Sequence, residues 1–166
     1  MYQAKTLLQN LNEEAATTRK FLEIVPVEKF NWQPHPKSMT LKALATHVAE
    51  IPGWTHMAIT TDELDFQSEA AAEYAYPPIE SREDLIAFFE KSYKKGRESL
   101  EKASDEELLP NWKLRNGKDV WVDCSKAEMI RISLNQSIHH RAQLGVYLRL
   151  LDIPIPGSYG PSADMH

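Results

Sequence analysis

Hydrophobic residues recur at steps of three and four in four stretches of the chain, which is the period of an α-helix with one buried face. The first stretch spans about residues 2–24 and ends before Pro26, because proline disfavours helical geometry in the preceding residue. The second begins near Thr40, with Ser38 or Thr40 as its N-cap. Pro52 interrupts it, so the pattern predicts a kinked second helix.

Two capping boxes mark the starts of the remaining helices, after a long connector over residues 61–80. Ser81 and Asp84 begin a helix that runs to about residue 103, and Ser125 and Glu128 begin one that reaches about residue 151. Between them, residues 108–124 lack a helical period and predict a small β-hairpin around Asn116-Gly117.

Four helices in a chain of 166 residues predict an all-α fold, a four-helix bundle, formed as a single domain over residues 1–166. The long second and third connections permit crossovers, so a simple up-down-up-down order does not follow from the sequence.

Composition narrows the choice of partners. The net charge is −5 and the Lys and Arg residues are scattered, which argues against a nucleic-acid partner. Cys124 is the single cysteine, so no internal disulfide can form, and this fits a reducing compartment. No signal-like segment or apolar run of about 20 residues occurs, so we expect a cytoplasmic protein without a membrane partner.

The fourth helix carries a polar stripe beside its core face, formed by Gln136, His140, Gln143 and Tyr147. Gln136 and His140 lie one helical turn apart, so both can meet His47, which flanks the apolar stripe of the second helix. Two imidazoles so placed can share one metal ion with a third ligand. The alternative from periodicity alone is a pair of hydrogen-bonded structural histidines.

A third side of the same helix is also apolar, with Ile132, Val146 and Leu150 beside His139. A helix that is apolar on so many sides is usually covered by more than its own bundle. This pattern predicts a homodimer.

Other candidate residues favour structural roles. Asp123 precedes Cys124 and would raise the thiol pKa, which argues against a nucleophile. His35 and His56 are expected at the surface or in loops, and Arg141 in an ion pair with a carboxylate of the first or third helix. The tryptophans are expected to anchor the core and the loops, with the lining of a substrate cavity as the alternative: Trp32, Trp54, Trp112 and Trp121.

Three segments together resemble the DinB family of small bacterial proteins: residues 38–47, residues 135–144 (NQSIHHRAQL) and residues 156–164. The resemblance covers the whole chain and is most specific in the second segment. It implies a four-helix bundle, commonly dimeric, in which three histidines bind a divalent metal, typically nickel or zinc. One of these histidines lies on helix two and an His-x-x-x-His pair lies on helix four.

Transferred by position, this metal site falls on His47, His140 and Gln136, so a glutamine stands where the family has a histidine. An amide oxygen is a weaker ligand than imidazole for a late transition metal. Gln136 could instead hold a metal-bound water, or Glu50 could assist. His139 points about 100° away from His140 and is a poor substitute.

The resemblance implies a metal-dependent thiol S-transferase or hydrolase acting on a small molecule, with a low-molecular-weight thiol as one substrate. The alternative is a degenerate, catalytically inactive dimeric binding or scaffold protein that has lost its metal through Gln136. The sequence assigns no catalytic residue.

Overall fold

The computed structural model describes residues 3–69, 71 and 75–165. Its main helices confirm the four predicted stretches: α1 (Ala4–Leu22), α2 and α3 (Leu41–Glu50 and Trp54–Thr60), α4 (Arg82–Lys102) and α5 (Lys126–Leu150). The helix starts follow the predicted signals. Both capping boxes form, and Thr40 rather than Ser38 caps α2 by accepting a hydrogen bond from the backbone N–H of Ala43.

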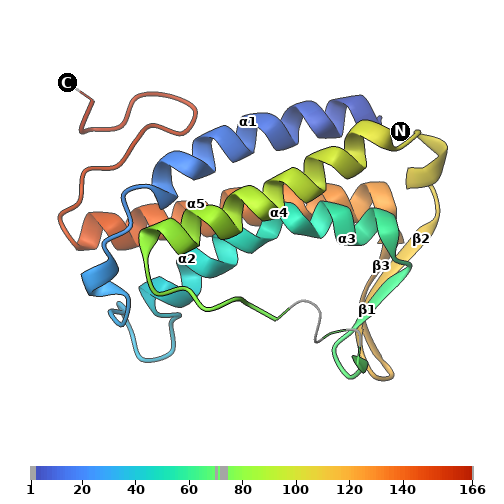
Figure 1. Cartoon of the computed structure of the whole chain (residues 1–166), viewed down its shortest axis with the longest axis horizontal. Coiled ribbons are helices and arrows are strands. Elements are labelled where there is room, and N and C mark those ends of the chain that lie inside the picture. The colour runs from blue at the N-terminus through green and yellow to red at the C-terminus, as the bar shows by residue number, and fades with distance from the viewer. Residues whose placement is uncertain (1–2, 70, 72–74, 166) are drawn as a thin grey trace.

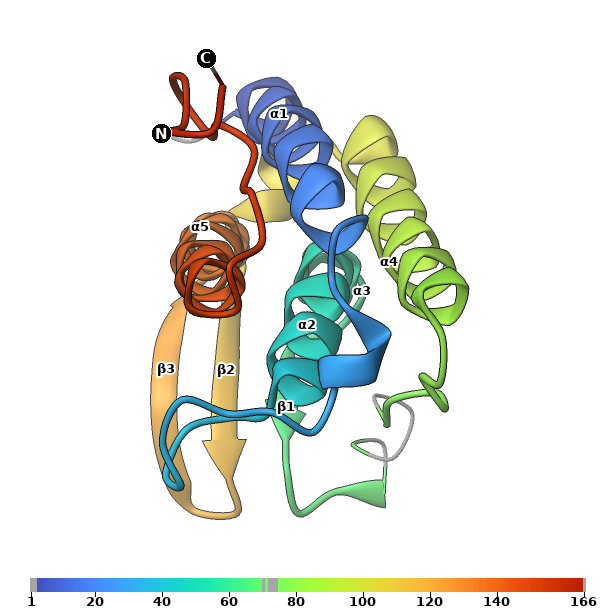
Figure 2. The same cartoon turned by 90° about the vertical axis from the view of Figure 1, so that its left-hand side faces the viewer.

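The bundle does not have the simple up-down-up-down order. In Figure 1, α1 and α5 run in one direction, and α2, α3 and α4 run in the other. Figure 2 shows α1 lying between α4 and α5 on one side of the bundle, with α2 and α3 between the same two helices on the other side. Helices α1 and α2 are therefore diagonal partners, and α2 lies directly beside α5.

Pro52 breaks the second helical stretch, as predicted. A short 3-10 turn, η2 (Ile51–Gly53), separates α2 from α3. Proline cannot donate a backbone hydrogen bond, so Pro52 cannot continue the α-helical pattern to the Val48 carbonyl. Within the turn the Trp54 N–H donates to the Ile51 carbonyl, and the Ser133 hydroxyl on α5 donates to the same carbonyl at 3.0 Å. The turn is therefore hydrogen-bonded directly to α5.

Gly96 on α4 allows this break to lie close against α4. A Cβ atom at Gly96 would stand 2.3 Å from the Pro52 carbonyl oxygen, whereas a Cβ at Gly53 would meet nothing closer than 3.5 Å. We expect Gly96→Ala to lower the free energy of unfolding by about 1–3 kcal/mol through overpacking, with little change in Gly53→Ala. Urea denaturation of both variants measures this, and equal midpoints would contradict the close approach.

A small sheet makes the all-α expectation wrong in part. Strands β2 (Asn111–Asn116) and β3 (Asp119–Ser125) form the predicted hairpin, with Gly117 at a positive φ of 61° in the turn. Strand β1 (Glu63–Asp65) pairs with β2 in parallel and was not predicted. Three residues with one apolar side chain are too short to show the alternation of a strand. The fold is a helical bundle with a three-stranded sheet at one end (Figure 1).

The core consists of two apolar clusters at opposite ends of the bundle. One gathers the end of α1, the start of α2 and α4, and the end of α5, around Leu22, Leu44, Phe89 and Leu148. The other surrounds Trp112, which is fully buried at the sheet end. Within the described ranges, no helix is long and apolar enough to cross a membrane.

Two of the tryptophans have the predicted core and loop-anchoring roles. Trp112 is a core residue, and Trp32 anchors the connector before α2 by an edge-on contact with Tyr147, at 5.5 Å between ring centroids. Trp121 contradicts the expectation, because it is 58% exposed on β3, beside Phe66. The register of β2 with β3 shifts at this point, and Trp121 is not paired with a residue of β2.

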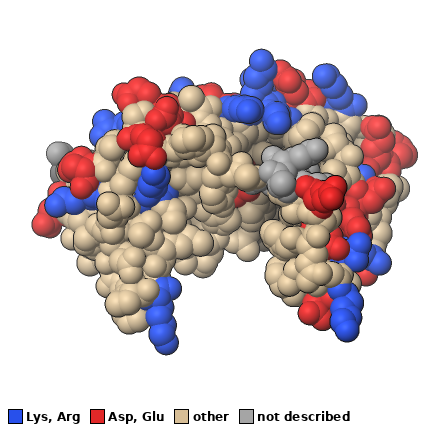
Figure 3. Space-filling model, turned by 60° about the horizontal axis from the view of Figure 1, so that its bottom comes forward, with Lys and Arg blue, Asp and Glu red and all other residues tan. Residues whose placement is uncertain are grey.

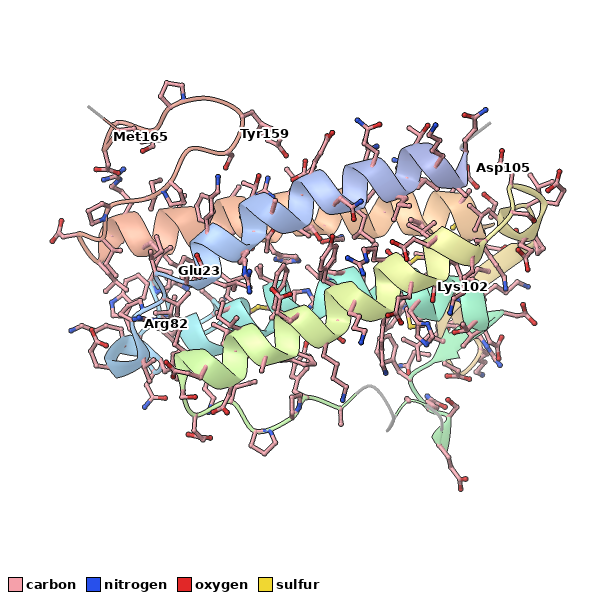
Figure 4. All side chains as sticks on the ribbon, turned by 45° about the horizontal axis from the view of Figure 1, so that its top comes forward. Glu23, Arg82, Lys102, Asp105, Tyr159 and Met165 are labelled. Carbon is pink, nitrogen blue, oxygen red and sulfur yellow. The ribbon has the colours of Figure 1, made fainter. Side chains whose placement is uncertain are left out.

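Arg141 confirms the predicted ion pair with the first helix. Its guanidinium is buried and contacts the Glu14 carboxylate on α1 at 2.6 Å. It also donates to the hydroxyl of Tyr159, in the segment that follows α5. In Figure 4 the labelled Tyr159 lies on this tail beyond α1, with its side chain turned back toward the helices. Arg141 therefore joins α5, α1 and the tail.

Cys124 has the raised thiol pKa that its sequence context predicts. Burial is the main cause, and the carboxylates of Glu128 and Asp123 add to it. A thiol in such surroundings stays protonated and unreactive. A structural role for Cys124 is consistent with this position on β3.

His56 is not the surface or loop residue that the sequence suggested. It lies on α3, half-buried, with its Nδ1 2.8 Å from the Ser99 hydroxyl on α4. Burial lowers its pKa, and the positive charge of Lys95 lowers it further. His35, in contrast, is exposed in the connector before α2, as expected.

Because the pKa of His56 is lower in the folded state, the unfolded chain binds a proton more readily below the ordinary histidine pKa. The contribution of neutral His56 to the free energy of unfolding is therefore fully present above about pH 6.5. It is lost as the pH falls from there through the lowered pKa of His56 in the folded protein. We expect His56→Gln to lose less stability than the wild type between pH 8 and pH 5. Urea unfolding at both pH values measures the difference, and identical pH dependence would contradict this role.

Candidate metal and ligand site

The structure brings His47 of α2 and His140 of α5 together, as the sequence predicts. Their ring centroids are 4.6 Å apart and the rings meet nearly at right angles, at 82°. The direct contact of α2 with α5 places both residues on the same face of the bundle. On its far side, the His47 ring contacts Trp54 edge-on, with 5.5 Å between centroids.

A chain of hydrogen bonds orients His47. Its Nδ1 is 3.2 Å from the Tyr76 hydroxyl, which donates to a Glu50 carboxylate oxygen at 3.0 Å. Since the tyrosine proton goes to Glu50, His47 must supply the proton between Nδ1 and the tyrosine oxygen. Glu50 also lies 3.3 Å from the same Nδ1. This arrangement leaves the Nε2 lone pair of His47 free.

Tyr76 remains a neutral hydrogen-bond donor in this chain. Burial raises its pKa strongly, and the charge and the hydrogen bond of Glu50 raise it further. Tyr76 lies in the long connector before α4, so the connector contributes directly to the candidate site.

Gln143 orients His140 in the same way, from one turn further along α5. Its amide oxygen lies 2.9 Å from His140 Nδ1 and its amide nitrogen 3.1 Å from His139 Nε2. With the oxygen accepting, His140 carries its proton on Nδ1, and its Nε2 lone pair is free. Burial lowers the pKa of His140, and the charges of His47 and His139 lower it further, whereas the hydrogen bond with Gln143 raises it. Its imidazole is therefore held in the unprotonated form.

The pair fits part of a metal site. Metal-bound histidines usually donate their second ring N–H to an oxygen of a neighbouring group, as His47 and His140 do here. Gln136 lies half-buried on α5, one turn before His140, where a third ligand is expected. Among residues 3–69, 71 and 75–165, no three His, Cys, Asp or Glu side chains cluster as a metal site. A third protein ligand for a metal ion at the histidine pair would therefore be the Gln136 amide.

Two pockets flank the histidine pair. One has a volume of about 340 Å³ and is lined by His47, Glu50 and Tyr76 together with side chains of α3, α5 and the sheet. The other lies between α5 and the connector before α2, where His140 and Gln143 face Met39. Figure 3 shows the molecule hollowed between two projections, with few charged side chains in the hollow. A small molecule can therefore reach the pair.

The family model described as the DinB family matches residues 1–165 of the chain. The chain belongs to the DinB family. A comparison with curated proteins gives no match.

Solved structures agree with the DinB assignment. A DinB-like protein from Bacillus cereus is 21% identical, with 96% of this chain and 100% of that chain covered and a TM-score of 0.72. A DinB-like protein from Bacillus subtilis is 16% identical, with 92% and 96% covered and a TM-score of 0.70. YfiT from Bacillus subtilis is 11% identical, with 91% and 89% covered and a TM-score of 0.66. YfiT is described as a probable metal-dependent hydrolase with an unusual four-helix bundle topology. At these identities, the likeness shows the fold.

Sequence reasoning on this DinB-family chain found the histidine pair but missed one of its partners. Tyr76 lies in a connector without periodicity, and no local signal links it to His47. Gln143 was on the predicted polar stripe, and its spacing from His140 already brought the two together. His139 lies closer to His140 than expected, with 4.8 Å between ring centroids.

Proposed function

We propose that this protein binds a divalent metal ion, nickel or zinc, between α2 and α5 through His47, His140 and Gln136. We further propose that it is a metal-dependent enzyme, a hydrolase or a thiol S-transferase acting on a small molecule. The description of YfiT as a probable metal-dependent hydrolase supports this class of reaction.

The observation that carries the proposal is the facing pair of imidazoles on α2 and α5. Both imidazoles donate from Nδ1 to an oxygen of a neighbouring side chain, so both Nε2 atoms are available. Structural histidines in a core usually use their free nitrogen on a buried protein partner. Here the pair faces a hollow with two pockets instead.

A bound divalent ion supplies Lewis acidity and lowers the pKa of a coordinated water or thiol. The residues of this chain prepare the site for it. Glu50 and Tyr76 hold the His47 ring in one orientation. The lowered pKa of His140 keeps its ring nitrogen unprotonated, so fewer protons compete for it near neutral pH.

Calorimetric titration of metal-free protein with nickel and with zinc tests the proposal. We expect one site per chain, and His140→Ala should weaken binding by at least about tenfold, as losing a ligand costs more than losing its hydrogen-bond partner. His35→Ala is the matched control, because it removes an exposed imidazole outside the site. Equal affinities in the two variants would overturn the proposal.

A second candidate function is favoured by Gln136 itself. A neutral amide replaces an imidazole in the ligand set, and an amide binds late transition metals weakly. In this alternative the protein is a degenerate, catalytically inactive binding or scaffold protein that keeps the pocket. A wild-type protein that binds neither metal at micromolar concentration would favour it.

We also propose that the protein forms a homodimer through the outer face of α5. Val146 and Leu150 are each 58% exposed on this face, which supports an interface there. Ile132 instead packs against the core at the sheet end. Light scattering after size-exclusion chromatography should give twice the chain mass, and Val146→Glu with Leu150→Glu should give the monomer. A monomeric wild type would exclude this proposal.

A further inference from the structure

One of the two pockets at the histidine pair has an uneven lining. Its polar groups, on His47, Glu50 and Tyr76, come from α2 and the connector that follows the sheet strand β1. The other lining side chains are aromatic or aliphatic: Trp54, Met57, Leu64, Phe66, Ala71, Ala75, Leu114 and Met129. The pocket thus has a polar end at His47 and an apolar body that extends toward the sheet.

The apolar body is built by separate elements that converge. Leu64 of β1 and Leu114 of β2 are paired in the parallel register, so their side chains stand on the same face of the sheet. Met57 of α3 and Met129 of α5 are both buried and line the pocket as well. Methionine side chains adapt their shape to a neighbouring group. The sheet, which the sequence only partly predicted, therefore forms one wall of the pocket.

The charge at the polar end selects against anions. Glu50 contributes a carboxylate, and no Lys or Arg is among the described residues that line the pocket. The Tyr76 hydroxyl donates its proton to Glu50 at 3.0 Å, so it is not available to an anionic ligand. In the metal-free protein, a negatively charged group placed here would lose its hydration without gaining a cationic partner.

We propose that this pocket binds the uncharged apolar part of the substrate, an aromatic or branched alkyl group. The substrate's reacting polar end then faces His47. The assignment of the ligand as substrate rests on the proposed function, whereas the binding of an uncharged apolar group does not. A volume of about 340 Å³ lies within the range of pockets that hold small organic ligands.

Two ligands with the same ring system test the proposal: 2-naphthalenemethanol, which is neutral, and 2-naphthoate, which is anionic. Binding of each is measured by calorimetry on chelator-treated wild-type protein. We expect saturable one-to-one binding of the alcohol, and at least about tenfold weaker binding of the carboxylate. Glu50→Gln should narrow this difference by raising the affinity for 2-naphthoate. No binding of the alcohol, or equal affinity for both ligands, would overturn the proposal.

A pair of leucine-to-tryptophan variants locates the binding. Leu64→Trp fills the pocket and should weaken binding of the alcohol by at least about tenfold. Leu109→Trp is the matched control, since Leu109 is 54% exposed and lies outside this pocket. Circular dichroism melting shows whether both tryptophan variants fold. If Leu64→Trp does not fold, the Glu50→Gln titration still tests the proposal. Equal binding in two folded tryptophan variants would contradict the assignment.

The metal titration and the ligand titration test separate claims, and each claim can be overturned without the other. Loss of the alcohol binding with intact metal binding would overturn the pocket assignment alone. Absent metal binding with intact, Leu64-dependent alcohol binding would overturn the proposed metal site and support the pocket.

Discussion

Replacing Arg141 with alanine is expected to lower the free energy of unfolding by about 3–5 kcal/mol, because it leaves a buried carboxylate without its cation. The side chains of Arg141 and Glu14 are only 2% and 15% exposed. The guanidinium also donates to the Thr18 hydroxyl at 3.1 Å and to the Tyr159 hydroxyl at 2.9 Å. Its loss would therefore remove the hydrogen bonds and the ion pair by which this residue of α5 holds α1 and the tail.

Arg149→Ala provides the control for this effect. Arg149 is on the same helix and pairs with Asp164, but its side chain is 45% exposed. An exposed pair contributes about 0–1 kcal/mol. Guanidinium denaturation of both variants measures the contrast. If Arg141→Ala were no less stable than Arg149→Ala, the joining role of the buried guanidinium would be wrong.

Gln136→His is expected to raise the affinity for nickel and zinc by about tenfold or more, because imidazole is the stronger ligand for late transition metals. The spacing of Gln136 and His140, one turn apart on α5, places a new imidazole beside the existing one. Calorimetric titration of metal-free protein measures the gain.

Gln9→His is the matched control for this variant, since it adds a histidine on the exposed side of α1. Unchanged affinity in Gln136→His would show that Gln136 does not face the proposed ion. A large gain in affinity without any reaction with thiols or esters would favour the degenerate protein. A wild-type site that is already saturated with metal would favour the enzyme.

The helices could be predicted closely because their signals are local. Periodicity, Pro52 and the two capping boxes act within one or two helical turns, and each was found where it was expected. The order of the helices in the bundle could not be predicted, because it depends on which apolar faces meet. Strand β1 was missed for a related reason: its pairing partner, β2, lies far along the chain.

In the candidate site, too, some features have local sequence signals and others depend on parts of the chain that are distant in sequence. His47 and His140 could be predicted to meet because each flanks the core face of its helix and because both match ligand positions of the DinB family. Tyr76 could not, because a connector has no period that fixes where its side chains point. The apolar pocket needed the register of Leu64 with Leu114, which no local pattern contains.

Zinc K-edge X-ray absorption on protein loaded with one equivalent of zinc tests the central claim most directly, since it reports the ligands of the ion itself. We expect nitrogen and oxygen ligands at about 2.0–2.1 Å, with outer-shell scattering from two imidazoles per zinc and from one in His140→Ala. Zinc without imidazole scattering, or with scattering unchanged in His140→Ala, would contradict a metal site built on His47 and His140.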